Sequence, residues 1–410
     1  MTKKASTPAL RFKGFTYTWE QRKLSEFADK VTEKNVGLQY IETFTNSAEF
    51  GIISQRDFFD HDIAKMSSLG GYYIVRSEDF VYNPRISTSA PVGPINRNKL
   101  GRIGVMSPLY TVFRPHDIDT TYLEHFFKSK YWHSFMNFNG DSGARSDRFS
   151  IKDFVFFEMP IPIPHIEEQR KIGEYLTHLD RLITLHQRKY DKLTNMKKSM
   201  LEKMFPKNGA NVPEIRFKGF TDAWEQRKLG EAVQEVTRND ATSDAPIMMI
   251  TANNGFIEQS ERYAFNNAGE SLKKYILLEK GELAYNHGAS KLRPYGSCFT
   301  LTTSENARIP FVYHCFSADE QNSEFLSIEL NGADVENQLR RIVSSGARMD
   351  GLLNISFQEY VSVSVLLPTI EEQNKIADFF KNLDRLITLH QRELEKLKNL
   401  KKACLEKMFV

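Results

Sequence analysis

Two stretches of the chain carry apolar residues at alternating spacings of three and four, and each predicts a long helix. The pattern runs through residues 167–204 and again through residues 371–408. Such spacing over about five heptads is typical of a coiled coil. Because a lone helix with an exposed apolar seam is unstable in water, we expect the two helices to pack together, and to run antiparallel if a two-fold axis relates the halves. The expected seam contains Leu179, Ile183, His186 and Leu193 in the first helix and Leu383, Ile387, His390 and Leu397 in the second. Its polar positions, which include Lys197 and Lys401, either set the register or mark places where the coil splays.

The two helical stretches are part of a larger internal duplication. Residues 166–205 and 370–409 are identical at 26 of 40 positions, and the motif RFKGFT..WEQRKL occurs at residues 11–24 and again at 216–229. Residues 27–140 and 232–343 share little, although a Tyr-Asn pair and a Ser-Gly-Ala-Arg loop recur at an offset of 203. One half-protein was therefore duplicated, and each half kept a scaffold while its middle diverged.

The diverged middles have the composition of mixed α/β (α+β) domains. Short β-branched or aromatic runs predict strands at 72–75, 110–113, 154–160, 311–316 and 360–368, and helices are expected at 121–138 and 324–341. We therefore expect two α/β (α+β) domains separated by the two long helices. The expected boundaries are 1–165 for the first domain, 166–206 for the first helix, 207–369 for the second domain and 370–410 for the second helix.

Composition and motif searches exclude several classes of function. No apolar run reaches the roughly 20 residues of a membrane helix, the first residues lack the apolar core of a signal peptide, and three cysteines give no disulfide framework. We expect a cytoplasmic protein without a membrane partner. The chain lacks the GxxxxGK[ST], GxGxxG, HExxH and GxSxG patterns of common catalytic sites. We therefore expect a non-catalytic protein that binds no cofactor or metal of its own.

Two unlike domains on a stiff spacer are suited to reading a split sequence in duplex DNA. Equivalent groove faces recur about every 34 Å along the duplex, so two half-site readers held at a fixed separation can recognise a site with an unread gap. The net charge of only +3 makes no general case for DNA, and residues 206–369 carry a net charge of −5 from 16 basic and 21 acidic residues. The alternative is a structural adaptor whose coiled coil bridges protein partners without DNA.

The repeated opening motif, the segment Lys280-Gly281-Glu282-Leu283-Ala284-Tyr285-Asn286, the Ser-Gly-Ala-Arg loop and the Pro-x-Ile-Glu-Glu-Gln helix start resemble type I restriction-modification specificity subunits. The resemblance covers essentially the whole chain. It implies two target recognition domains that each read one half of a bipartite, asymmetric site in double-stranded DNA. It also implies that the helices bind two modification subunits, which methylate adenine with S-adenosylmethionine, and that two restriction subunits join with ATP and Mg²⁺. Both cofactors and the metal would be held by those other subunits.

Two clusters in each half are candidates for DNA contact. The first follows the Tyr-Asn pair, and the second is the Ser-Gly-Ala-Arg loop. Arginine can bond guanine and asparagine can bond adenine, each through two hydrogen bonds, whereas serine favours phosphate. Any single arginine can equally be a solvated surface charge, and the two asparagines can equally hold turns. The candidates are Tyr82, Asn83, Arg85, Ser87, Ser89, Arg145 and Arg148 in the first half and Asn286, His287, Ser290, Lys291, Arg293 and Arg348 in the second. Trp19 and Trp224, which both repeats keep, are expected to anchor the cores.

Overall fold

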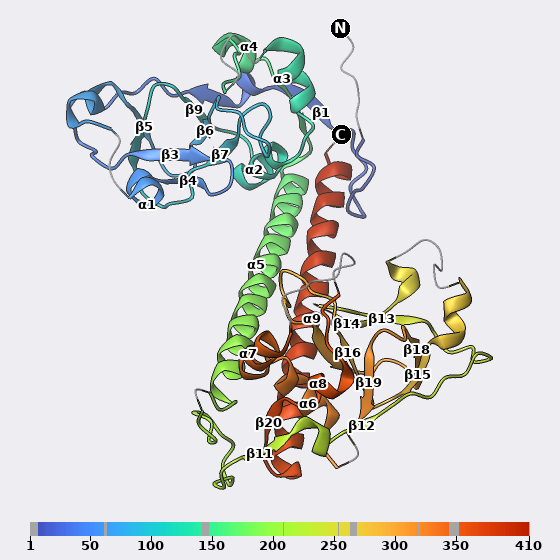
Figure 1. Ribbon diagram of the computed structural model, residues 1–410. Helices are drawn as coiled ribbons and strands as arrows, with labels where there is room; N and C mark the ends of the chain where they lie inside the picture. The colour runs from blue at the N-terminus through green and yellow to red at the C-terminus, as the bar shows by residue number, and fades with distance from the viewer. Residues whose placement is uncertain are drawn as a thin grey trace. The chain divides into compact units, whose positions relative to one another are not determined.

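The computed structural model describes residues 7–60, 64–141, 147–207, 209–252, 254–262, 269–318, 320–343 and 352–409. The chain divides into two compact units. Unit 1 comprises Met1–Arg188 and His390–Val410, and unit 2 comprises Lys189–Leu389. Each unit holds one mixed domain and the adjoining parts of both long helices, α5 (Ile166–Lys203) and α9 (Ile370–Lys407) (Figure 1).

Unit 1 is built around a four-stranded antiparallel sheet of order β2-β9-β6-β7. These strands are Ala28–Lys30, Thr111–Pro115, Phe80–Tyr82 and Ile95–Arg97. Three antiparallel pairs accompany the sheet: β1 (Glu20–Lys23) with β10 (Pro160–Ile163), β3 (Phe44–Ser47) with β4 (Gly51–Ser54), and β5 (Tyr73–Val75) with β8 (Gly104–Met106). The shorter helices are α1 (Gln55–Phe59), α2 (Thr120–Lys128), α3 (His133–Asn139) and α4 (Asp153–Phe156), with 3₁₀ turns η1 (Leu24–Glu26) and η2 (Met66–Gly71).

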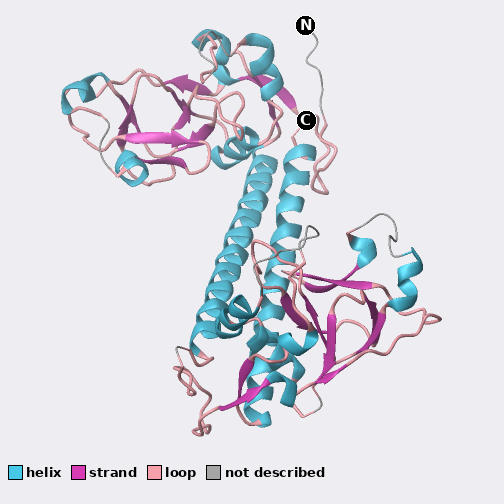
Figure 2. Ribbon diagram, viewed as in Figure 1, coloured by secondary structure: helices cyan, strands magenta, loops and turns pink. Residues whose placement is uncertain are grey.

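Unit 2 repeats this arrangement strand for strand. Its sheet has the order β12-β19-β16-β17, formed by Gln234–Glu235, His314–Ser317, Leu283–Asn286 and Ser297–Thr300. The pairs are β11 (Glu225–Lys228) with β20 (Ser364–Leu367), β13 (Met248–Thr251) with β14 (Gly255–Glu258), and β15 (Ile276–Glu279) with β18 (Asn306–Ile309). The helices are α6 (Ser323–Leu330), α7 (Ala333–Ile342) and α8 (Phe357–Tyr360), with 3₁₀ turns η3 (Leu229–Glu231), η4 (Gln259–Glu261) and η5 (Gly269–Lys274). The expected α+β class is confirmed, and every pairing between the strands named above is antiparallel (Figure 2).

Several expected elements differ in detail. Each of the helices expected at 121–138 and 324–341 is two helices, because α2 ends before Ser129, whose backbone is extended, and α6 ends at Leu330, two residues before Gly332. The strand expected at 154–160 is wrong: α4 occupies its start, with Phe154 exposed and Phe156 buried, and β10 begins only at Pro160. The run at 360–368 likewise contains the end of α8 before β20, and the run at 311–316 begins with a turn before β19.

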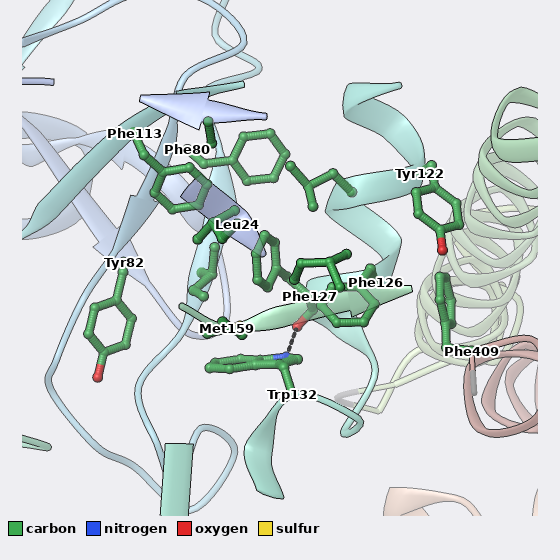
Figure 3. Packing of buried hydrophobic residues seen from close by; sticks show 14 of the residues in the cluster. Leu24, Phe80, Tyr82, Phe113, Tyr122, Phe126, Phe127, Trp132, Met159 and Phe409 are labelled. Atoms are coloured by element: carbon green, nitrogen blue, oxygen red, sulfur yellow. Dashed lines mark hydrogen bonds between the residues drawn. The ribbon is translucent and has the colours of Figure 1, made fainter. Parts of the chain in front are cut away.

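The core of unit 1 is a cluster of aromatic side chains between the sheet and α2. Phe80 and Phe113 stack with ring centroids 5.5 Å apart, and Phe126 and Phe127 approach from the helix (Figure 3). The Nε1–H of Trp132 donates to the carbonyl oxygen of Phe127 at 3.0 Å, so this buried indole is satisfied. Burying such rings is the main stabilising contribution to a domain of this kind.

The repeated opening motif is docked against the start of each long helix. Arg11 donates two hydrogen bonds to Glu168, at 2.6 and 2.8 Å, and Arg216 donates two to Glu372, both at 2.7 Å. Both carboxylates lie in the first turn of a helix, where the helix dipole also favours negative charge. Trp19 and Trp224 are each 2 % exposed within the cores of their units, which confirms them as core anchors. The motif is therefore repeated for structural reasons.

The two long helices agree with the predicted ranges to within one residue at each end. In unit 1, Asp180 of α5 pairs with Lys401 of α9, and the Nδ1 atoms of His186 and His390 lie 3.1 Å apart. Moving from Asp180 to His186 along α5, the partners in α9 go from Lys401 back to His390. The helices are therefore antiparallel, as expected. In unit 2, Lys197 pairs with Asp384 at 2.6 Å. The two seam lysines therefore form matched ion pairs between the helices. Of the predicted seam, Leu179 and Leu383 are buried, and the other members are half-buried: Ile183, His186, Leu193, Ile387, His390 and Leu397.

No helix in the described part of the chain is long and apolar enough to cross a membrane.

Candidate nucleic-acid interface

The loop that follows the Tyr-Asn pair has the same frame in both units. It joins β6 to β7 in unit 1 and β16 to β17 in unit 2. The hydroxyl of Tyr82 donates to the carbonyl oxygen of Val92 at 2.9 Å, and that of Tyr285 donates to the carbonyl oxygen of Tyr295 at 2.6 Å. Each tyrosine is buried, and its hydrogen bond joins the beginning of its loop to the end.

A glycine is required at the end of each loop. Gly93 and Gly296 have φ angles of +84° and +82°, a region that other residues rarely adopt. A Cβ atom on Gly93 would also lie 2.1 Å from the carbonyl oxygen of Asn83, and one on Gly296 would lie 2.6 Å from that of Asn286. The backbones approach too closely for any side chain, so the two glycines fix where each loop begins and ends.

The paired asparagines hold the loops through matching hydrogen bonds. Asn83 donates from Nδ2 to the carbonyl oxygen of Asn46 at 2.8 Å, and its Oδ1 accepts from the backbone N–H of Arg85 at 2.9 Å. Asn286 donates to the carbonyl oxygen of Ile250 at 3.1 Å and accepts from the N–H of Gly288 at 2.9 Å. Both side chains are therefore occupied as turn residues, which was the alternative to a base contact.

The tip of each loop is a turn held by a serine. The Oγ of Ser87 accepts from the N–H of Ala90 at 3.2 Å, and the Oγ of Ser290 accepts from the N–H of Arg293 at 3.0 Å. The backbone N–H of Ser87 also donates to the carbonyl oxygen of Ala90, and the N–H of Ser290 donates to that of Arg293, both at 3.0 Å. The exposed residues between them differ: unit 1 presents Thr88-Ser89, and unit 2 presents Lys291-Leu292.

One residue of each predicted cluster, Arg85 and Arg148, is brought together in unit 1. The N–H of Phe149 donates to the carbonyl oxygen of Pro84 at 2.7 Å, and Ile86 donates to that of Asp147 at 3.0 Å, which places Arg85 opposite Arg148. Unit 2 has the equivalent pairing, with Gly288 opposite Leu352 and a bond of 2.9 Å from Leu353 to the carbonyl oxygen of His287. The other two candidate arginines, Arg145 and Arg348, lie outside the described residues, as do both Ser-Gly-Ala-Arg loops.

Three of the candidate side chains point into the protein. Tyr82 is 2 % exposed, stacks on Phe156 and has its pKa raised by burial. His287 is 7 % exposed, with Nδ1 2.7 Å from the carbonyl oxygen of Leu353 and Nε2 2.6 Å from that of Val312.

Arg293 is the third of these side chains. Its Nη1 donates to the carbonyl oxygen of Asn331 at 2.9 Å, and burial lowers its pKa. All three side chains are engaged in the frame of the loop, and we remove Tyr82, His287 and Arg293 from the set of DNA-contact candidates.

The remaining described candidates lie at or near the surface. Arg85, Ser89 and Lys291 are exposed, whereas Arg148 is half-buried and lines a pocket of about 510 Å³ together with Lys30 and Tyr110. Within the described ranges, no three His, Cys, Asp or Glu side chains are grouped so as to hold a metal ion. The exposed side chains of the site offer hydrogen-bond donors and positive charge.

Comparison with known proteins agrees with this assignment. Residues 17–195 match the family model described as the type I restriction modification DNA specificity domain. The chain is 24 % identical over 271 residues to the type I restriction enzyme MjaVIII specificity subunit of Methanocaldococcus jannaschii, covering 60 % of each protein. Residues 17–195 thus match this domain family, and the chain is similar to type I restriction enzyme specificity subunits.

Further relatives are consistent with the family. The putative type I restriction enzyme MjaX specificity subunit of the same organism is 22 % identical over 272 residues, covering 62 % of this chain and 59 % of that protein. The chain thus spans about three fifths of the length of each curated relative. The crystal structure of a type I restriction-modification system S subunit from M. genitalium shares the fold, with a TM-score of 0.59, 13 % identity and 99 % of each chain covered.

The structure adds two candidate residues that sequence reasoning missed. Thr88 and Leu292 lie at the exposed loop tips, next to predicted residues. They could have been found by comparing the two repeats in register, since Ser87 with Ser290 and Gly93 with Gly296 share the offset of 203 and leave Thr88-Ser89 opposite Lys291-Leu292. A choice based only on polar side chains picks Ser87 and Ser290, which hold the turn.

Proposed function

We propose that this chain is the DNA-specificity subunit of a type I restriction-modification complex, and that each unit reads one half of a bipartite, asymmetric site in double-stranded DNA. The observation that carries the proposal is the turn held by Ser87 in unit 1 and by Ser290 in unit 2. Its frame is the same in both units, whereas the exposed residues at its tip differ. A constant frame with variable tips is what two readers of unlike sequences require.

The chemistry of the tips suits different bases. Lys291 offers a point charge for phosphate or for the acceptor edge of guanine, and Leu292 offers an apolar contact for a thymine methyl group. In unit 1, Thr88 and Ser89 offer small hydroxyl groups beside Arg85 and Arg148, whose guanidinium groups match guanine. Since residues 206–369 carry a net charge of −5, attraction of DNA to the second domain has to be local to this loop.

We further propose that the long helices bind two modification subunits at equivalent surfaces. Away from the seam, Leu185 and Leu389 are 46 % and 51 % exposed, and they occupy the same place in the two repeats. Met196 and Leu400 form a second equivalent pair, at 38 % and 42 % exposed. Exposed apolar side chains at matching places favour two copies of one protein partner.

The complex that follows from this proposal has its chemistry in other subunits. The modification subunits would methylate adenine with S-adenosylmethionine, and two restriction subunits would use ATP and Mg²⁺. This chain would supply specificity and no catalytic residue. Glutamate in place of Leu185 or Leu389 is expected to weaken binding of a modification subunit without unfolding the chain, and size-exclusion chromatography of reconstituted complexes measures the loss.

Methylome sequencing of cells with and without the gene tests the proposed function. We expect one bipartite, adenine-methylated motif to disappear on deletion and to return with the wild-type gene on a plasmid. If every methylated motif persists, the chain does not direct methylation. A salt-insensitive complex that retains partner proteins but no DNA would then favour the structural adaptor.

A further inference from the structure

Unit 2 contains a pocket of about 550 Å³ whose lining includes Arg293, the residue that follows the candidate DNA loop tip. It is lined by parts of α5, α6, α7 and α9 and by the residues that follow α5. Phe205, Phe380 and Ile328 give it an apolar lining. The volume lies in the range of small-molecule sites, which are mostly apolar and carry a few placed polar groups.

One carboxylate in this pocket is buried and only partly satisfied. Glu329 is 8 % exposed, and its Oε1 accepts from the N–H of Leu366 at 3.1 Å. Among the described residues, its other oxygen has no hydrogen-bond partner. Burial, opposed by the bond from Leu366 and aided by the like charge of Asp334, raises the pKa of Glu329 to about 7. A carboxylate held this way is stabilised by any cation that enters the pocket.

Three of the basic side chains that line the pocket are engaged, and a fourth, Lys207, is exposed. Lys197 pairs with Asp384 at 2.6 Å, and Lys381 pairs with Glu324 at 2.7 Å. Arg293 donates from Nη1 to a backbone carbonyl oxygen, and its buried Nε has no partner. Within the described ranges, the Glu329 carboxylate forms no ion pair. Since an opposite charge nearby favours the ionised form of a carboxylate, a ligand that supplies a cation gains affinity there.

Unit 1 places a phenylalanine where unit 2 has this carboxylate. Asp119 caps α2 and Asn322 caps α6, each by accepting a hydrogen bond from a backbone N–H three residues further on. When the two helices are aligned at these caps, Phe126 corresponds to Glu329. Phe126 is fully buried and contacts Phe409, with ring centroids 5.8 Å apart (Figure 3). The buried carboxylate is thus a feature of the second repeat alone.

We propose that this pocket of unit 2 binds a small organic cation, one per chain, with an apolar body against Phe205, Phe380 and Ile328 and a protonated nitrogen against the free oxygen of Glu329. The proposal is independent of the DNA-reading function. The same chemistry can come from a free amine or from a basic side chain of a bound protein.

Ligand-observed NMR on the full chain tests the proposal with three probes: 2-phenylethylamine, its neutral counterpart 2-phenylethanol, and N-acetyl-arginine methylamide for a protein side chain. At concentrations up to about 5 mM, we expect at least one cation to bind about tenfold more tightly than the alcohol. The tighter of the two cations identifies the source. If neither cation binds, or if the alcohol binds equally well, the proposal is overturned.

Two variants of one residue separate the site from the fold. Glu329→Gln keeps an acceptor for the Leu366 N–H and removes the charge, so cation binding should fall about tenfold, to the level of the alcohol. Glu329→Phe introduces the residue that unit 1 tolerates at this position and should abolish binding of all three probes by filling the pocket. Circular dichroism confirms that each variant is folded. Unchanged cation binding in a folded Glu329→Gln chain contradicts the assignment.

Discussion

Removing the arginine from either docked opening motif is expected to destabilise the unit that contains it. The side chains of Glu168 and Glu372 are 1 % and 0 % exposed, and those of Arg11 and Arg216 are each 12 % exposed. Replacing one arginine by glutamine leaves a buried carboxylate without its cation, which typically costs about 3–5 kcal/mol. The bonds to Glu168 and Glu372 also raise the pKa of each arginine, so both guanidinium groups stay charged at any physiological pH.

The two substitutions should not be equal. The Nε1–H of Trp19 donates to Glu168 at 3.2 Å, whereas the Nε1 of Trp224 is buried without a partner. After Arg11→Gln, Glu168 keeps one donor, but after Arg216→Gln, Glu372 keeps no side-chain donor that the structure describes. Because a hydrogen bond to a charged group contributes about 1.5–3 kcal/mol, we expect Arg216→Gln to cost its unit about 1.5 kcal/mol more.

Hydrogen–deuterium exchange of the full chain measures the two effects separately, because peptides from β1 and β11 report on units 1 and 2. Arg22→Gln is a matched control, since Arg22 pairs with Glu26 at the surface and such a pair contributes only about 0.3–0.5 kcal/mol. Equal protection in the wild type and both buried-pair variants would refute the reasoning. A larger effect of Arg11→Gln would refute the role given to Trp19.

Two further predictions test the loop frame and the buried carboxylate. Gly93→Ala should abolish sequence-specific DNA binding and cost at least about 2 kcal/mol in exchange protection of β6, because the methyl group meets the carbonyl oxygen of Asn83; Gly101→Ala, at φ +68° in open space, is the control, and equal effects would contradict this account. Since folding raises the pKa of Glu329 from 4.5 to about 7, the folded state binds more protons in that interval and the stability of unit 2 should fall as the pH rises through it, by up to about 3 kcal/mol. Urea unfolding at pH 5 and 8 should show this fall in the wild type and not in Glu329→Gln, and a fall of equal size in both proteins would contradict the assignment.

The sequence predicted the fold well where a pattern repeats over many residues. The spacing of apolar positions located both long helices, because the heptad pattern of a coiled coil is local in sequence and repeats over many turns. The domain interiors were less predictable because their elements are short. Phe154 and Phe156 are compatible with a strand by alternation, and only tertiary packing selects the helical turn of α4.

Prediction of the site was limited by what side-chain type can reveal. Tyr82, His287 and Arg293 are of types that bind DNA, but the structure uses them to close and support the loop. Only the contacts distinguish a guanidinium that faces solvent, as in Arg85, from one that bonds a backbone carbonyl, as in Arg293. The internal repeat carries more information: residues that keep the same bonds in both units form the frame, and residues that differ at the tip are the candidates for specificity.

The most direct test of the central claim transfers one loop tip to the other unit. Thr88→Lys together with Ser89→Leu gives unit 1 the tip of unit 2, and methylome sequencing of cells that express the variant gives the recognised motif. The account predicts that one half of the bipartite motif changes while the other half and the length of the gap stay the same. A motif that is unchanged, or one that changes in both halves, would contradict it.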